Sequence, residues 1–247
     1  MNEIPLPRAD RSSTLLSSIS KSTFHMYTYA FIPESAAHLE LPAGIAGSLQ
    51  TVWDSGIGAL VEAELDVEAL QRSDEQLMQA VLHHDQVIRE MFEQTVLLPL
   101  RFGTYFVSSD KLLEHLQAHA AEYLDKLAVL SDQAEYTLKL VLVDPITATD
   151  PEDTSGKGYF LAKKQQFQRQ LEQQQQQQSE LGMLKEAIAT LYPNWRLDTP
   201  RDGIERIHLL VNRTHEPVLA DHLNQWIALC SHWQLSLSEA LPPYHFV

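Results

Sequence analysis

The order of secondary-structure signals in the second half of the chain is the feature that most limits its possible folds. A Leu- and Val-rich run from Glu135 to Val143 predicts a strand that is covered on both faces, and Tyr159 to Leu191 predicts a long helix. A weak strand, a strong strand, a helix and a last strand follow at residues 195–197, 204–211, 216–229 and 234–241. The order β-α-β-β-α-β is the split βαβ pattern of a ferredoxin-like fold, an antiparallel sheet with helices on one face.

The first half of the chain has an α+β pattern of its own. Strand signals cover residues 24–32, 49–52 and 57–65, and helices are expected at 74–95 and 110–130 with a strand at 97–106 between them. In the third strand, Ile57 and Val61 alternate with Glu62 and Glu64, so we expect one buried face and one face in water. The fold class predicted from the sequence is therefore α+β with two domains.

Composition sets the expected boundaries of the two domains. Residues 1–21 are rich in Ser and Pro and predict a flexible arm, and the domains are expected at 22–133 and 134–241. Residues 242–247 form a proline- and aromatic-rich tail that we expect to be held on a surface by its rings. In the long helix, the glutamine-rich section after Glu172 has no apolar residue, so it is expected to project into solvent.

Charge and cysteine content exclude several classes of partner and cofactor. The net charge of −15 argues against nucleic acid and anionic membrane lipid, because both attract clustered Lys and Arg. Cys230 is the single cysteine, so neither an internal disulfide nor a cysteine-based metal cluster is expected. No window approaches the about 18 apolar residues of a membrane span. We expect a soluble protein of the cytoplasm that needs no cofactor.

The stretch from His83 to Phe106 is the first candidate functional site. His84 falls on the apolar stripe of a helix that begins with a Ser73 capping box, and Pro99 indicates a strand at a sheet edge. Arg101 would then project from the strand end. One interpretation is a core histidine with bonded ring nitrogens and an arginine paired with a carboxylate. The other is a small-molecule enzyme that uses His84 and Arg101, but two residues without geometry define no reaction, and we assign no catalytic residue.

A second candidate is a pair of histidines on the predicted helix at 110–130. His115 and His119 lie four residues apart, with Glu122 one turn further on, and this spacing can bind a metal ion. The angular positions of these residues on the helix favour a solvated face, so we predict no metal site there.

Four short motifs follow one another along the chain: Tyr27-Thr28-Tyr29, the Leu-Pro-Leu-Arg-Phe-Gly-Thr run at 98–104, the Gly-Tyr-Phe-Leu-Ala-Lys-Lys run at 158–164, and Pro-Pro-Tyr-His-Phe at 242–246. In this order they resemble the gas vesicle protein F/L family and are most like its cyanobacterial gas vesicle protein F type. The similarity covers about residues 24–247. One departure lies before the tail, where family members often carry Gly-Pro-Trp and this chain has Glu239-Ala240-Leu241.

The resemblance implies an accessory or minor structural protein of gas vesicles rather than an enzyme. Such a protein is expected in the cytoplasm with the vesicle, where it binds the hydrophobic shell-forming protein and limits its aggregation during nucleation; other gas vesicle accessory proteins are further partners. A binder of this kind needs an exposed apolar or edge-strand surface. We place that surface at the strand edge or under the tail, and the expected partner-binding residues are Pro99, Arg101, Phe102, Tyr105, Tyr244 and Phe246.

Overall fold

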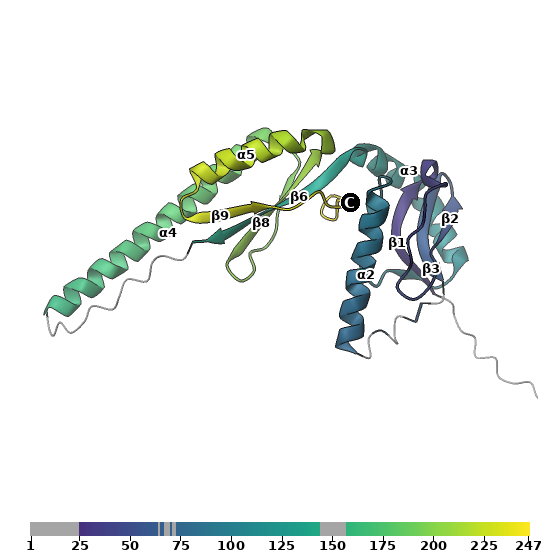
Figure 1. Ribbon diagram of the computed structural model, residues 1–247, viewed down its shortest axis with the longest axis horizontal. Helices are drawn as coiled ribbons and strands as arrows, with labels where there is room; N and C mark the ends of the chain where they lie inside the picture. Colours follow the sequence, from purple (N-terminus) through teal and green to yellow (C-terminus); the bar gives the residue numbers. More distant parts are fainter. Residues whose placement is uncertain (1–24, 64, 67–69, 71–72, 144–156) are drawn as a thin grey trace, which may run out of the picture.

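Two antiparallel sheets with their helices make up the computed structural model of the chain (Figure 1). The structure describes residues 25–63, 65–66, 70, 73–143 and 157–247. The predicted arm at 1–21 and the predicted loop after Val143 lie outside these residues. We refer to the first sheet with its helices as the first domain, and to the second sheet with its helices as the second domain.

The first sheet has β1 at its centre. β1 (Met26–Pro33) pairs on one side with β3 (Ile57–Ala63), which pairs in turn with β2 (Gln50–Asp54). On its other side β1 pairs with β4 (Leu98–Pro99) and β5 (Tyr105–Phe106). The predicted strand at 97–106 is therefore two short strands with a turn between them, and Pro99 lies at the sheet edge as predicted. A short 3-10 helix, η1 (Glu34–Ala36), follows β1.

Two helices cover the two faces of this sheet (Figure 1). α2 (Asp74–Phe92) packs Val87 and Met91 on the face that holds Leu60, and α3 (Ser109–Leu130) packs against the face that holds Ile57 and Val61. β3 is thus buried on both faces, and the prediction of one solvent-exposed face is wrong. An alternating pattern shows which residues share a face, but it does not show what covers that face.

The second sheet confirms the predicted ferredoxin-like arrangement. β6 (Gln133–Leu142) and β8 (Ile204–Asn212) are central, and β7 (Trp195–Leu197) and β9 (Trp233–Leu237) are the edges of the order β7-β8-β6-β9. All pairs are antiparallel. The helices are α4 (Lys157–Leu191) and α5 (Glu216–Leu229), and a 3-10 turn, η2 (Arg213–His215), leads into α5.

The helices of the second domain lie on one face of its sheet (Figure 1). Leu138 and Leu140 of β6 pack there with Leu184 of α4 and Leu219 of α5. The prediction that both faces of this strand are covered is only half right, because Lys139 on the other face is exposed. The same core cluster contains Tyr29 of the first domain, so the two sheets share one apolar core, and the residue boundaries of the domains stay a prediction.

The first half of α4 extends past the sheet (Figure 1). Phe160 and Phe167 are 71% and 66% exposed there. Contact with the domain begins inside the glutamine-rich section, where the Gln177 carbonyl accepts a hydrogen bond of 3.1 Å from Trp233. Glu180, next to that section, is buried and bonds to Ser231 and His232. The expectation of a projecting section is therefore right for the residues before Gln177.

Candidate functional site

The predicted binding surface at the edge of the first sheet is only partly accessible. Arg101 is exposed in the turn between β4 and β5, and Tyr105 is 47% exposed beside Val107, which is 53% exposed. The Tyr105 ring lies 4.7 Å from that of His25. Pro99 is buried, and Phe102 packs edge-on against His84 with ring centroids 5.6 Å apart. The accessible part of the predicted surface thus comprises Arg101 and Tyr105, to which the structure adds Val107.

His84 holds this turn in place from inside the core. Its Nε2 lies 3.1 Å from the Leu100 carbonyl and must donate, so Nδ1 accepts from the Tyr27 hydroxyl at 2.9 Å. The Tyr27 oxygen in turn accepts the Gly103 N–H at 3.3 Å. Gly103 has φ of +85°, a conformation that glycine adopts without strain. These bonds join α2 and β1 to both ends of the turn.

The protonation state of His84 follows from its burial. Burial lowers the pKa of His84, and the hydrogen bond to Leu100 opposes this only in part, so the imidazole is neutral. Burial likewise raises the pKa of Tyr27 to about 12. The core-histidine interpretation is confirmed. Among the described residues no ion pair of Arg101 is present, so its pairing with a carboxylate stays a prediction.

The histidine pair on α3 is less exposed than predicted. His115 is half-buried, its ring centroid lies 5.1 Å from that of Phe106, and its Nε2 is 2.7 Å from the Tyr123 hydroxyl. Burial, together with the nearby His119, lowers the pKa of His115. His115 therefore helps to pack β5 against α3, which the angular position on a helix did not reveal.

Glu62 is a buried carboxylate that sequence reasoning placed in water. It is 1% exposed and accepts three consecutive backbone N–H groups, those of Ile45, Ala46 and Gly47, at 2.8, 2.7 and 2.5 Å. The Tyr29 hydroxyl donates to the same carboxylate at 2.5 Å, and burial followed by this bond raises the pKa of Tyr29. Glu62 therefore fixes the loop at 44–47 over the sheet.

The C-terminal tail is held by a second buried carboxylate, Glu135, which is 1% exposed. The His245 backbone N–H and its Nδ1 donate to the two oxygens of Glu135 at 2.9 and 2.7 Å. Nδ1 of His208 lies 3.2 Å from the same oxygen that bonds the His245 ring. Burial raises the pKa of Glu135, but the bonds from His208 and His245 outweigh burial and leave the pKa below its usual value.

Glu135, His208 and His245 together offer metal-ligating atoms within 4.8 Å of one another. A carboxylate and two imidazoles are common ligands of zinc. However, the two imidazole rings stack face to face, with centroids 3.6 Å apart and planes 15° apart. The lone pairs of the imidazole nitrogens lie in the planes of the two rings. Because the rings are stacked, these lone pairs are nearly parallel and do not point at one metal ion. The geometry fits two N–H···O bonds to one carboxylate better than a chelate.

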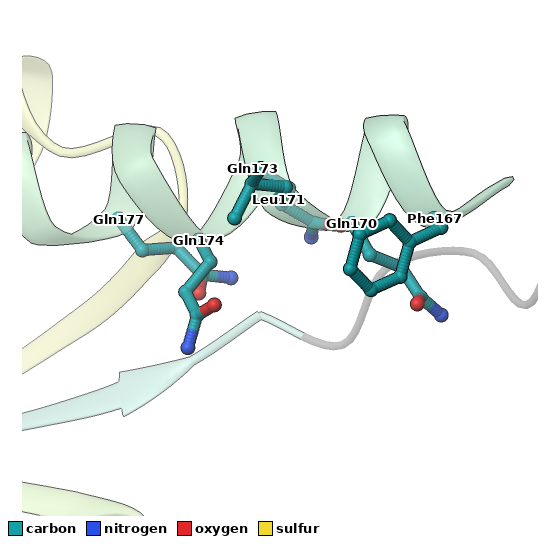
Figure 2. Close-up of a pocket in the computed structure, with 6 residues that line it drawn as sticks. All are labelled: Phe167, Gln170, Leu171, Gln173, Gln174 and Gln177. Atoms are coloured by element: carbon teal, nitrogen blue, oxygen red, sulfur yellow. The ribbon is translucent and has the colours of Figure 1, made fainter. Parts of the chain in front are cut away.

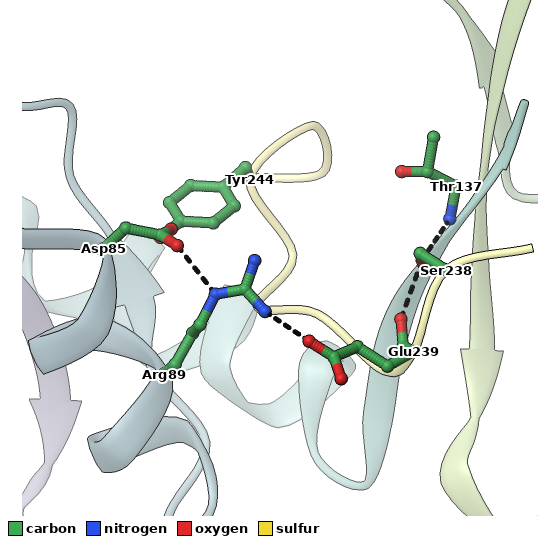
Figure 3. Close-up of polar contacts among 6 residues, drawn as sticks. All are labelled: Asp85, Arg89, Thr137, Ser238, Glu239 and Tyr244. Atoms are coloured by element: carbon green, nitrogen blue, oxygen red, sulfur yellow. Dashed lines mark hydrogen bonds and ion pairs between the residues drawn. The ribbon is translucent and has the colours of Figure 1, made fainter. Parts of the chain in front are cut away.

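The tail also links the two domains (Figure 3). The Tyr244 hydroxyl and Arg89 Nε both donate to Asp85 of α2 at 2.7 Å, and Arg89 also bonds Glu239 at 2.8 Å. Tyr244 and Phe246, predicted as partner-binding residues, are thus half-buried contacts within this chain. The tail is held by its rings as predicted, but also by the polar bonds of Tyr244 and His245.

Three pockets in the described part of the chain do not contain His84 or Arg101, the two residues of the enzyme alternative. One pocket of about 360 Å³ is lined by six side chains of α4 alone, among them Phe167, Leu171 and Gln174, and none of the six is ionisable (Figure 2). Neither His84 nor Arg101 lines this pocket or the pockets beside Arg213 and His83. The Phe, Leu and Gln side chains of the α4 pocket cannot act as a general acid or a general base.

These features define the class of protein as an α+β protein of two joined domains. Its buried carboxylates and histidines hold a loop, a strand edge and the C-terminal tail in place. None of the helices in the described part of the chain is long and apolar enough to cross a membrane.

Comparisons with known proteins identify the family within this class. The family model of gas vesicle synthesis protein GvpL/GvpF matches residues 25–247. Gas vesicle protein F of Streptomyces sp. (strain CB03234) is 26% identical, in a match that covers 90% of this chain and all of that protein. Crystal structures of the gas vesicle protein GvpF from Anabaena sp. PCC7120 and from Microcystis aeruginosa share the fold. Their TM-scores are 0.66 and 0.65 at 14% and 16% identity, and each comparison covers 90% of this chain and 98% of the other.

The chain belongs to the GvpL/GvpF family of gas vesicle synthesis proteins. The resemblance noted in four short motifs extends over nearly the whole chain.

Proposed function

We propose that this protein binds the hydrophobic shell-forming protein of gas vesicles and keeps it from aggregating while the vesicle nucleates and grows. The family supports a role with gas vesicles. The observation that carries the binding proposal is the edge of the first sheet. There Tyr105 and Val107 are about half exposed, and β4 and β5 pair with β1 and with no other strand of the described residues. An edge strand can pair with a segment of a partner, and exposed apolar side chains add contact area.

The charge of the chain suits this role. A complex with an apolar partner stays in solution only if the binder supplies charge, and the net charge of −15 supplies it. The enzyme alternative has less support, because both ring nitrogens of His84 are bonded inside the core and Arg101 points away from it into solvent. We therefore propose a protein that is not an enzyme and that accompanies the vesicle in the cytoplasm.

The surface is tested by the double variant Y105S/V107S. Co-expressed with the shell protein, the wild type should keep the shell protein in the soluble fraction and co-purify with it, whereas the variant should bind about tenfold more weakly because two apolar contacts are lost. The matched control is V129S/Y159S, which removes the same residue types at positions that are 68% and 49% exposed. Equal binding by both variants would reject this surface.

A second measurement separates retention in the wall from assistance in assembly. Vesicles are floated from the source cells, washed and probed for the protein, while the soluble fraction is probed for its complex with the shell protein. Signal in washed vesicles identifies a minor structural component, and signal only in the soluble complex identifies an assembly factor. Absence from both contradicts the proposed function.

A further inference from the structure

The described residues cover only half of the second sheet's face that carries no helix. The tail covers the rows that hold Glu135 and His208, as described above. The next row of the same face contains Lys139 of β6, which lies directly opposite Arg206 of β8. Arg196 of β7 borders this row, opposite His208. We name Lys139, Arg196 and Arg206 the basic face.

The cations of the basic face lack carboxylate partners among the described residues. Like charges directly opposite one another on neighbouring strands are destabilising, yet Lys139 and Arg206 form such a pair. The acidic residue next to this row is Asp198, and its backbone N–H donates to the backbone carbonyl of Arg206. The Asp198 side chain does not pair with the Arg206 guanidinium; its Oδ1 accepts the Thr199 N–H at 2.8 Å. In a chain with a net charge of −15, a surface row with a net positive charge is a local reversal.

The tail shows what kind of contact this sheet face makes. The Phe246 ring lies under the guanidinium of Arg196, with 5.3 Å from Cζ to the ring centroid. The sheet face thus binds the turn formed by the tail through rings and polar atoms. Beyond Lys139 and Arg206 the next row holds Val141 opposite Ile204, both half-buried, so the uncovered half of the face combines cations with apolar side chains.

We propose that the basic face is a docking site for an acidic, amphipathic segment of a partner protein. Charge complementarity selects an acidic occupant, and the Val141–Ile204 row selects an apolar side chain next to the acidic ones. Nucleic acid is disfavoured, because three cations on an otherwise acidic molecule provide too little neutralisation of a phosphate backbone. The site is separate from Tyr105 and Val107, so it does not depend on the function proposed above.

The test uses the full chain and a labelled amphipathic peptide with Glu on one face and Leu on the other. Fluorescence anisotropy should show binding that weakens with added salt, and the same peptide with Lys in place of Glu should not bind. The variant K139E/R206E should bind the acidic peptide at least about tenfold more weakly. K139Q/R206Q, which places no new charges opposite each other, should also weaken binding.

The matched control is K164E/R169E, which changes the net charge equally at two exposed positions on α4. It should bind like the wild type. The proposal is overturned if the acidic peptide does not bind, or if both charge-reversal pairs weaken binding alike. Tighter binding of a thymidine oligonucleotide than of the peptide would overturn it in favour of nucleic acid. A salt-sensitive dimer that only K139E/R206E abolishes would show that a second copy occupies the face.

Discussion

Two glutamates illustrate how residues far apart in sequence decide burial. Glu62 and Glu135 are each 1% exposed, and each accepts both backbone and side-chain hydrogen bonds. The backbone donors to Glu62 are 15 to 17 residues away in the loop at 44–47, and the donors to Glu135 include His245, which is 110 residues away. A buried carboxylate is stable only with such donors, so each glutamate fixes the segment that supplies them.

The pH dependence of stability follows from Glu135. Its folded pKa is lower than that of an unfolded glutamate, about 4.3, so its stabilisation is present above that pH and is lost as pH falls through the folded pKa. At neutral pH we expect E135Q to lower the free energy of unfolding by about 2 kcal/mol, because charged bonds to His208 and His245 are lost. The difference from wild type should shrink below about pH 4.

Denaturant titrations of wild type and E135Q between neutral and acid pH measure this difference. E172Q is the control, because Glu172 is exposed on α4, and its effect should stay within about 0.5 kcal/mol at every pH. If E135Q lowers the free energy of unfolding by the same amount at every pH, the charge of the Glu135 carboxylate is not the source of the stabilisation.

Helices and strands could be predicted from the sequence where the residues within the element itself determine its type and its ends. The predicted order β-α-β-β-α-β, the short strand β7 and the Ser73 cap of α2 are all present in the structure. The solvent face expected for β3 and the full cover expected for β6 were wrong, because cover depends on where α2, α3 and the tail pack. The tail site escaped prediction for the same reason, although Glu135 and His208 both lie opposite the apolar faces of their strands.

The two halves of α4 should differ in what they contribute to stability. Phe167 and Leu171 are 66% and 46% exposed, so F167Q/L171Q should change the free energy of unfolding by less than about 0.5 kcal/mol. Leu184 is fully buried, so L184A should cost about 3 kcal/mol. Guanidinium titrations compare the variants. A large loss from F167Q/L171Q would mean that the first half of α4 packs against the protein.

At the scale of the whole molecule, polar contacts from α2, in addition to the Arg89–Glu239 ion pair described above, tie the domains together around a shared core. Tyr244 of the tail bonds Asp85 of α2, and Arg213 donates to the Phe92 carbonyl at 2.8 Å with its guanidinium 3.9 Å from the Phe92 ring centroid. Burial, and then the bond to Asp85, raise the pKa of Tyr244, so its hydroxyl keeps the proton that it donates. Because both contacts join α2 to the second domain, the domains should unfold as one cooperative unit.

The variant R213A/Y244A tests this cooperativity. One tryptophan, Trp53, lies in the first domain, and three lie in the second, at 195, 226 and 233, so fluorescence reports mainly on the second domain whereas circular dichroism reports on both. In the wild type the thermal transitions followed by fluorescence and by circular dichroism should coincide.

In R213A/Y244A the two transitions should separate, because each domain then unfolds at its own midpoint. The control Y159A/R169A removes the same residue types on α4, away from these contacts, and should leave the transitions coincident. Coincident transitions in R213A/Y244A would mean that the shared apolar core and the remaining Arg89–Glu239 ion pair are enough to couple the domains.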